Sequence, residues 1–345
     1  MAPSGNASGA VPGAGPLNTR PESRPGPSQA QQRHAIEPHP RALSAGRQDL
    51  KRHWSLYLMA LPGVLSILVF GYGPLFGLAI AFLDYSPIRG VRGSDWVGLD
   101  NFRAAFKNPF FAQALRNSLI ISSLKLAVGF PSAIILALLL NEVRARWFQR
   151  LVQTATILPF FVSWVVIAAM FRSLLAPDGV VNEIRTQLLG LQPVIFLSDP
   201  AKFRWVIVLQ DTWKYAGYFA VLYLAAMTAI DPTLYEAAMV DGANRWRQTL
   251  DITLPGIRAT MVTLFVLLTG YLIFAGWEQV IVIMYNPSVY ATGDILETFT
   301  LRLGLSQSKY GLATAVGLSQ SVIGLGLVLV TNTLAKRFNE DGGLF

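Results

Sequence analysis

Between two long apolar runs, the chain reads Glu236-Ala237-Ala238-Met239-Val240-Asp241-Gly242, and ten residues after the glycine comes Ile252-Thr253-Leu254-Pro255. The run on either side is long enough to cross a lipid bilayer as a helix. The segment between them carries charged and helix-forming residues instead. This arrangement predicts two membrane helices joined by a compact polar loop over residues 231–258.

The loop has its own start and stop signals. Asp231 followed by Pro232 is typical of a helix N-cap and first helical residue. A short helix is therefore expected over residues 233–241, and Gly242 can adopt the left-handed conformation that ends it. Asn244 is placed to cap a second short helix as far as about residue 252, and Pro255 interrupts the chain before the next span. A helix–turn–helix attached to two spans can transmit force to both.

The whole chain is too apolar for an ordinary soluble domain, since 52% of its 345 residues are hydrophobic and 14% are charged. A span needs about 20 mostly apolar residues, and lipid offers the backbone no hydrogen-bond partners, so each span must be a helix. Six runs meet this condition. They cover residues 54–83, 115–140, 151–175, 205–230, 260–284 and 312–334. The predicted fold is all-α and integral to the membrane.

Positive residues beside the helix ends set the orientation, because they favour the cytoplasmic side. If both termini are cytoplasmic, four positively charged groups lie inside: Lys51 and Arg52, the cluster at residues 144–150, the loop 231–258 and Lys336-Arg337. The net charge of +8 is spread over these membrane flanks, which does not indicate nucleic-acid binding. Residues 1–50 are rich in Pro, Gly and Ser and are expected to form a disordered cytoplasmic tail.

Several spans contain helix-breaking residues. Pro74, Pro131 and Pro159 are expected to kink or break their helices, either beside a cavity or as ordinary packing irregularities. In the last span Gly311, Ala315 and Ser319 recur at four-residue steps, which favours close packing on another helix of this chain or of a partner.

The fixed residues of the 236–255 segment resemble the signature loop of ATP-binding-cassette (ABC) importer permeases, with every position at the family spacing. Beyond it, Tyr57-Leu58-Met59-Ala60-Leu61-Pro62 and Leu158-Pro159-Phe160-Phe161-Val162-Ser163-Trp164 are similar to the carbohydrate-uptake branch. The resemblance covers essentially everything after residue 50. It points to maltose-type permeases and to permeases for oligosaccharides from plant or algal polysaccharides, and it makes residues 51–345 a permease domain of the type I fold.

The resemblance implies that the first short helix inserts into a cleft of a separate ATPase, where Glu236 meets a basic residue. The implied coupling residues are Glu236, Ala237, Ala238, Asp241, Gly242, Leu254 and Pro255. It also implies a second homologous permease subunit, an ATPase dimer that holds ATP and Mg²⁺, an extracellular solute-binding protein, a sugar substrate and the lipid of a bacterial plasma membrane.

The sequence contains no phosphate-binding loop, no cysteine and no zinc-protease or serine-hydrolase motif, and its three histidines precede or only touch the first span. We therefore expect no catalytic residue, no metal site and no bound cofactor in this chain. A non-sugar ABC importer and an ion-gradient-driven transporter remain alternatives, and a membrane enzyme is disfavoured.

Charged residues within spans indicate function because they are costly there. Lys125, Arg172 and Glu278 lie within spans, and so do Asp211 and Lys214, which are three residues apart and expected to pair. Aromatic side chains, including Tyr215 and Tyr271, stand around them, as sugar binding requires. The substrate-path candidates are Asp211, Trp213, Lys214, Tyr218, Trp277 and Glu278. The alternative is a structural ion pair among interfacial aromatic belts.

Overall fold

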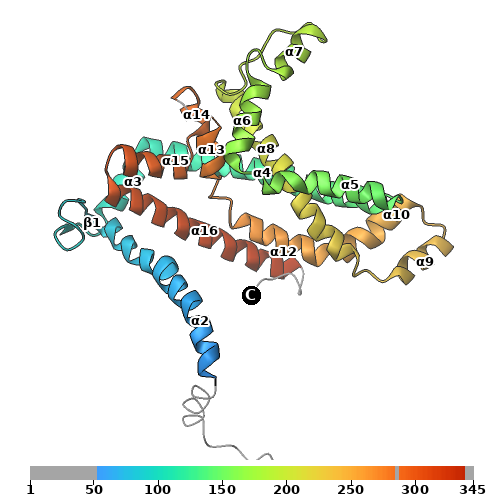
Figure 1. Ribbon diagram of the computed structural model, residues 1–345, viewed down its shortest axis with the longest axis horizontal. Coiled ribbons are helices and arrows are strands. Elements are labelled where there is room, and N and C mark those ends of the chain that lie inside the picture. Colours follow the sequence, from blue (N-terminus) through green and yellow to red (C-terminus); the bar gives the residue numbers. More distant parts are fainter. Residues whose placement is uncertain (1–52, 284–286, 339–345) are drawn as a thin grey trace, which may run out of the picture. The chain divides into compact units, whose positions relative to one another are not determined.

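A computed structural model describes residues 53–283 and 287–338 (Figure 1). Within these ranges the regular secondary structure is helical, apart from one antiparallel pair of short strands, β1 (Leu83–Asp84) and β2 (Asp95–Trp96). The expected N-terminal tail lies outside the described residues and stays a prediction. The chain divides into two compact units, residues 1–67 and 68–345.

The first unit contains helix α2 (Trp54–Ser66), which includes Pro62 and has no buried residue. Its large apolar side chains are exposed; Met59 is 80% exposed. A helix that is apolar on all sides matches what a lipid environment requires.

After α2 the helix changes type rather than breaking. It continues as the π-helix η2 (Ile67–Tyr72) and the 3₁₀-helix η3 (Gly73–Phe82), in which Pro74 occupies the first turn. Helices α3 (Asp100–Lys107) and α4 (Pro109–Glu142) follow. The break expected at Pro131 is absent, because α4 runs through it without interruption.

The break expected at Pro159 is confirmed, so the run predicted as a span over residues 151–175 is not one continuous helix. The structure has α5 (Arg146–Ile157), a 3₁₀ turn η4 (Leu158–Phe161) and then α6 (Trp164–Leu175), followed by α7 (Val180–Gln187). Pro159 cannot donate a backbone hydrogen bond, so the helix ends near it. Ser163 then caps α6 by accepting a hydrogen bond from the Val166 backbone N–H at 3.4 Å.

The span predicted over residues 205–230 corresponds to α8 (Pro200–Met227), which begins at the N-cap Asp199. The loop then contains α9 (Pro232–Val240), α10 (Arg245–Gln248), the π-turn η5 (Thr249–Thr253) and α11 (Leu254–Gly256). Helix α12 (Arg258–Thr269) follows directly.

The run predicted as a span over residues 260–284 is also not one continuous helix. Helix α12 ends before Gly270, and helix α13 (Trp277–Val282) begins only after Gly276, whose φ of +87° favours glycine. The rest of the chain comprises η6 (Pro287–Val289), α14 (Tyr290–Gly293), α15 (Leu296–Leu301), η7 (Arg302–Ser306) and α16 (Tyr310–Phe338).

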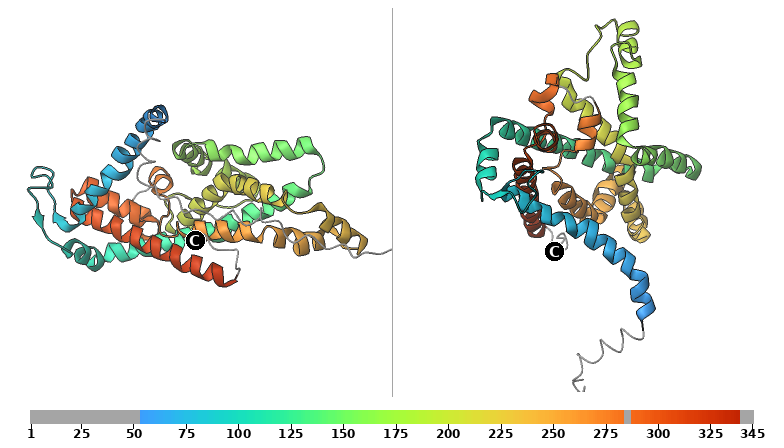
Figure 2. Two further views of the ribbon diagram at one scale, coloured as in Figure 1. Left: turned by 90° about the horizontal axis from the view of Figure 1, so that it is seen from below. Right: turned by 60° about the vertical axis from the view of Figure 1, so that its left-hand side comes forward.

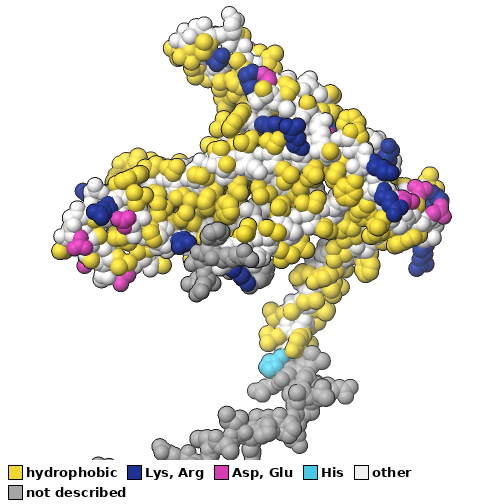
Figure 3. Space-filling model, turned by 180° about the vertical axis from the view of Figure 1, so that it is seen from behind, with side chains coloured by type: hydrophobic (Ala, Val, Ile, Leu, Met, Phe, Trp, Pro, Cys, Tyr) yellow, Lys and Arg dark blue, Asp and Glu magenta, His cyan; other side chains and the backbone are white. Residues whose placement is uncertain are grey.

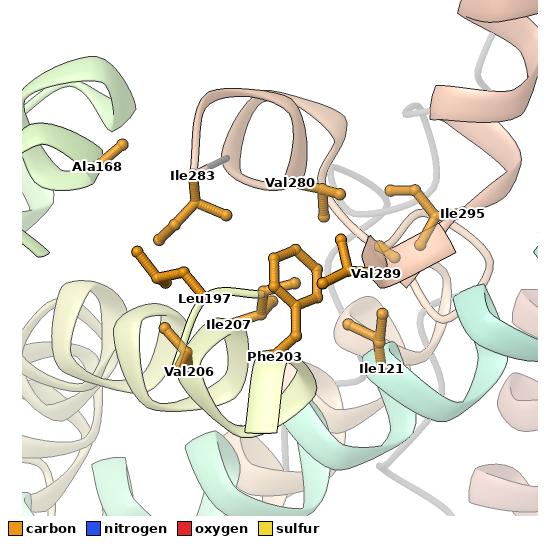
Figure 4. Packing of buried hydrophobic residues seen from close by; sticks show 11 residues of the cluster. Ile121, Ala168, Leu197, Phe203, Val206, Ile207, Val280, Ile283, Val289 and Ile295 are labelled. Atoms are coloured by element: carbon orange, nitrogen blue, oxygen red, sulfur yellow. The ribbon is translucent and has the colours of Figure 1, made fainter. Parts of the chain in front are cut away.

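Close helix packing builds the second unit. Helix α5 lies beside α8 in both views of Figure 2, and a Cβ added to Gly217 of α8 would lie 2.1 Å from the Thr156 carbonyl oxygen. Gly311 of α16 likewise faces the Leu83 carbonyl, and Ala315 and Ser319 are buried, so these three small residues of the last span pack within this chain. Figure 4 shows one buried cluster, in which Phe203 and Ile207 of α8 meet Val280 of α13 and Ile283, the residue that follows α13.

By length and composition, four helices in the described ranges could each cross a membrane, or up to six if each of two bent pairs is one span. The four cover residues 54–82, 109–142, 164–187 and 310–336. Figure 3 shows hydrophobic side chains over the middle of the second unit, with charged side chains gathered toward its ends. This distribution suits a protein whose middle section lies in the lipid bilayer.

Candidate functional site

The loop at residues 231–258 starts and turns as its sequence predicts. The Asp231 carboxylate accepts a hydrogen bond from the Thr233 backbone N–H at 2.9 Å. The hydrogen bonds from Thr233 hold the pKa of Asp231 below its ordinary value of 3.8. This charged cap is therefore lost only as the pH falls below that value. Gly242 has a φ of +77°, and Asn244 caps α10 by accepting from the Arg247 N–H at 2.9 Å. The predicted caps and turn are confirmed.

Hydrogen bonds hold the two short helical segments of the loop together. The Tyr235 hydroxyl lies 3.0 Å from the Thr253 hydroxyl, and the Gln248 side-chain amide donates to the Ala243 carbonyl at 3.0 Å. Gln248 and Thr253 are buried. The chain bends by 76° between α8 and α9 and by 60° before α12. A stiff element thus projects from the ends of α8 and α12 (Figure 1).

Most of the expected coupling residues face outward. Glu236, Ala237, Asp241, Gly242 and Pro255 are exposed, whereas Ala238 and Leu254 are half-buried. Leu254 packs with the cluster around Ile257.

Three apolar side chains of α9, Leu234, Met239 and Val240, are also exposed, by 52%, 56% and 89%. Sequence reasoning had not singled them out, although all three lie in the same short helix. Exposed apolar residues at a charged end of the molecule are typical of a protein-docking surface.

A cavity of about 340 Å³ lies between α4, α8 and the link from α12 to α13. Its polar wall contains Ser122, Lys125, Asp211 and Thr212. The hydroxyl oxygens of Ser122 and Thr212 are buried and have no hydrogen-bond partner within the described part of the chain. Its aromatic wall contains Phe130, Tyr215, Phe219, Tyr223, Tyr271 and Phe274.

Lys125 is the central contact of the polar wall. Its ammonium lies 2.9 Å from the Asp211 carboxylate and donates to the Ala275 carbonyl at 2.8 Å and to the Gln279 side-chain oxygen at 2.7 Å. The Lys125 and Asp211 side chains are 12% and 21% exposed. One cation therefore joins α4 to α8 and to the non-helical link before α13.

The predicted pair between Asp211 and Lys214 is wrong. Lys214 is buried and donates instead to the carbonyls of Pro159, Phe160 and Val162 at the break between α5 and α6. Helical spacing permits the pair, but carbonyls released by a broken helix must find donors where water is excluded. The Lys214 ammonium also lies 5.2 Å from the centre of the Trp164 ring.

The other substrate-path candidates do not line this cavity. Trp213 packs edge-on against Phe171, and Tyr218 stacks on Phe160 with ring centres 4.3 Å apart. Trp277 and Glu278 are exposed. Of the six candidates, the structure brings only Asp211 into the cavity wall. Lys125, Tyr215 and Tyr271 were recognised as an in-span charge and in-span aromatics, but spacing alone could not place them there.

No group of three or more His, Asp or Glu side chains suited to a metal ion occurs within residues 53–283 and 287–338.

Comparison with known proteins identifies the class. Residues 129–340 match the family described as binding-protein-dependent transport system inner membrane component, and the chain belongs to this family of ABC-importer permeases. It is similar to the protein LplB of Bacillus subtilis (strain 168), with 44% identity over 85% of this chain and 92% of LplB. The polygalacturonan/rhamnogalacturonan transport system permease protein YteP of the same organism is 43% identical, over 83% of this chain and 89% of YteP.

A solved structure of a bacterial ABC transporter involved in the import of the acidic polysaccharide alginate has the same fold. It aligns with a TM-score of 0.78 and 39% identity over 86% of this chain and 99% of that one. The chain is therefore a membrane component with the type I permease fold, located in the bacterial inner membrane.

Proposed function

We propose that this chain is a permease subunit of an ATP-driven oligosaccharide importer. Its family membership and its similarity to permeases named for polygalacturonan and arabinooligosaccharide transport support this assignment. Lactose is the named substrate of another relative, at 31% identity. The recurrence of sugars among these names favours a carbohydrate over other solutes.

The cavity beside Lys125 and Asp211 is the proposed translocation site. Its volume of about 340 Å³ lies within the range of small-molecule sites. Aromatic rings can cover the apolar C–H faces of a sugar, while the carboxylate, the ammonium and the unpartnered hydroxyls of Ser122 and Thr212 can bond sugar hydroxyls. The main support for the proposal is this cluster of polar side chains, which lines one wall of a cavity whose other wall is aromatic. The cavity lies between the continuous helices α4 and α8 and the non-helical link that follows α12.

The stiff loop at residues 231–258 is the proposed contact with the ATPase. In this arrangement six spans place both termini and the loop in the cytoplasm. A second permease completes the path, an ATPase dimer holds ATP and Mg²⁺, and an extracellular binding protein delivers the sugar.

The connectivity of the structure suggests how force on the loop reaches the cavity. Helix α12 follows the loop directly and ends at the link that carries Ala275, whose carbonyl accepts the Lys125 hydrogen bond. When the ATPases close on ATP and draw the loop inward, α12 moves relative to α4, so the cavity wall must rearrange. Hydrolysis and release of the ATPases reset it.

The test is uptake of a labelled oligosaccharide by cells that express the complete importer. We expect uptake to stop when ATP is depleted and to continue when an ionophore collapses the ion gradients. The opposite pattern would establish an ion-driven transporter. Uptake of a non-sugar solute alone would establish the other alternative.

A further inference from the structure

A second cavity lies in the same unit. Helices α3 and α15, which contribute to its wall, lie at the end away from α9 and α10 (Figure 1). Its volume is about 680 Å³. Its walls come from the end of α3, the start of α4 and the segment from Tyr290 to Lys309. In the proposed orientation this end faces the exterior, where the substrate arrives.

The wall of this cavity carries an excess of positive charge. Three cations, Lys107, Arg302 and Lys309, line it with one carboxylate, Asp294. Asp294 is 2% exposed, and the Arg302 guanidinium bonds it at 2.6 Å and 3.3 Å. The charges of Asp294 and Arg302 therefore cancel, and the net positive charge of the wall comes from the two lysines.

Lys107 and Lys309 are both exposed. Among the residues that the structure describes, neither has a carboxylate within ion-pairing distance. The N-terminus of the 34-residue helix α4 lies on the same wall, at Pro109, and contributes the positive end of the helix dipole, although the Asn108 side chain caps it by accepting from the Phe110 N–H. The cavity is therefore suited to an anion.

The remaining wall indicates more than a bare anion. The exposed ring of Phe110 offers an apolar face, and the Gln307 side-chain amide offers hydrogen bonds. The Gln113 amide nitrogen already donates to the Tyr290 carbonyl at 2.8 Å, which leaves its oxygen as an acceptor. Aromatic and amide groups suit a sugar ring, whereas the lysines suit a carboxylate. A volume of about 680 Å³ is also larger than a single acidic side chain of a docked protein would need.

We propose that this outer cavity binds the carboxylate of an acidic saccharide, such as a uronic-acid oligosaccharide, before the sugar enters the membrane. The inference rests on the proposed function and narrows its substrate class. Lys107 and Lys309 supply the recognition charge. The Asp294–Arg302 pair ties the segment that carries Lys309 to itself, and Gln113 and Asn117 of α4 hold it against α4 by donating to the carbonyls of Tyr290 and Asp294.

The experiment uses the assembled importer in lipid nanodiscs without its binding protein. Contacts between the binding protein and the importer then cannot contribute to the measured sugar binding. The probes are trigalacturonate, a mannuronate trimer and their carboxyl-reduced, neutral counterparts. We expect at least one acidic trimer to bind more tightly than its neutral counterpart. The double variant Lys107→Gln, Lys309→Gln should weaken acidic binding about threefold to tenfold and leave neutral binding unchanged.

Two controls separate charge at this site from charge elsewhere. Lys107→Arg with Lys309→Arg should retain acidic binding. Arg92→Gln, which removes an exposed cation from the loop between β1 and β2, should have no effect.

Equal binding of acidic and neutral trimers, or an unchanged preference in the double variant, would overturn the inference. An equal loss of uptake for both kinds of probe, with direct binding unchanged, would instead make the cavity a docking site for the binding protein and would also overturn it. Failure of all ATP-driven uptake by the wild-type complex would refute the proposed function, and the binding measurement would still decide this inference.

Discussion

Lys125 links three parts of the cavity wall through one ammonium group, so its removal should be costly. Lys125→Met leaves Asp211 without its cation in a mostly buried place. Breaking such a pair costs about 3–5 kcal/mol, whereas replacing both partners by apolar residues is often nearly neutral. We expect Lys125→Met to lower the thermal stability of the purified protein and abolish uptake. The double variant Lys125→Met, Asp211→Leu should recover stability but not uptake.

Thermal unfolding in detergent and uptake in cells measure these two effects separately. If the single and double variants were equally unstable, the pair would have no special role. If the double variant transported normally, the polar wall would not contact substrate.

Lys214 has a different role, because its three hydrogen bonds go to backbone carbonyls and its side chain does not line the cavity. Lys214→Met leaves these acceptors unsatisfied, at a cost of about 1–3 kcal/mol for a buried group. We expect lower thermal stability with unchanged preference among sugars that are still transported. A changed preference would show that Lys214 contacts the substrate after all.

These two lysines show what sequence reasoning could reach at this scale. The cost of charge in lipid singled out Lys125, Asp211 and Lys214, and the structure gives each of them a polar partner. Helical spacing then suggested the wrong partner for Asp211, because the true partner is 86 positions earlier in the chain and only the fold brings the two together. Caps in the 231–258 loop were predictable, since each depends on residues three or fewer positions apart.

At the scale of elements, the most specific prediction concerns the loop at residues 231–258. Helix α9 has no buried residue and presents Glu236 beside exposed apolar side chains. Glu236→Lys reverses a charge that is proposed to meet a cation of the ATPase, so it should abolish both ATPase binding and uptake. Copurification of the ATPase with the permease measures the first effect. Normal membrane insertion of the variant shows that folding is intact.

A matched control is Asp178→Lys, which reverses an exposed carboxylate in the segment between α6 and α7. It should leave ATPase binding unchanged. Normal copurification by Glu236→Lys, or equal losses in both variants, would contradict the assignment of the loop.

Helix breaks illustrate the limit of prediction for elements. The apolar runs located most helices, but hydropathy alone cannot show that two of these runs contain breaks. Pro159 gave a signal for the first break, whereas Pro131 gave the same signal in a helix that stays continuous. The difference lies in tertiary partners: Lys214 is available to satisfy the carbonyls near Pro159. Local sequence patterns cannot reveal such a partner, because Lys214 lies 55 positions after Pro159 in the chain.

For the whole molecule, the decisive question is which ends face the cytoplasm. The natural chain has no cysteine, so a single introduced cysteine reports its own position without background labelling. Val240 in α9 is 89% exposed, and Ile88 in the loop between the strands is 98% exposed. With six spans and both termini inside, Val240→Cys lies in the cytoplasm and Ile88→Cys lies outside.

We therefore expect a membrane-impermeant maleimide to label Ile88→Cys in intact cells and Val240→Cys only after the membrane is permeabilised. Both positions are exposed, so poor accessibility within the protein cannot explain a difference between them. Because the loop at 231–258 can reach an ATPase only from the cytoplasm, labelling of Val240→Cys in intact cells would refute the coupling role and the orientation together. Labelling of Ile88→Cys only after permeabilisation would refute the placement of the cationic cavity at the outer face.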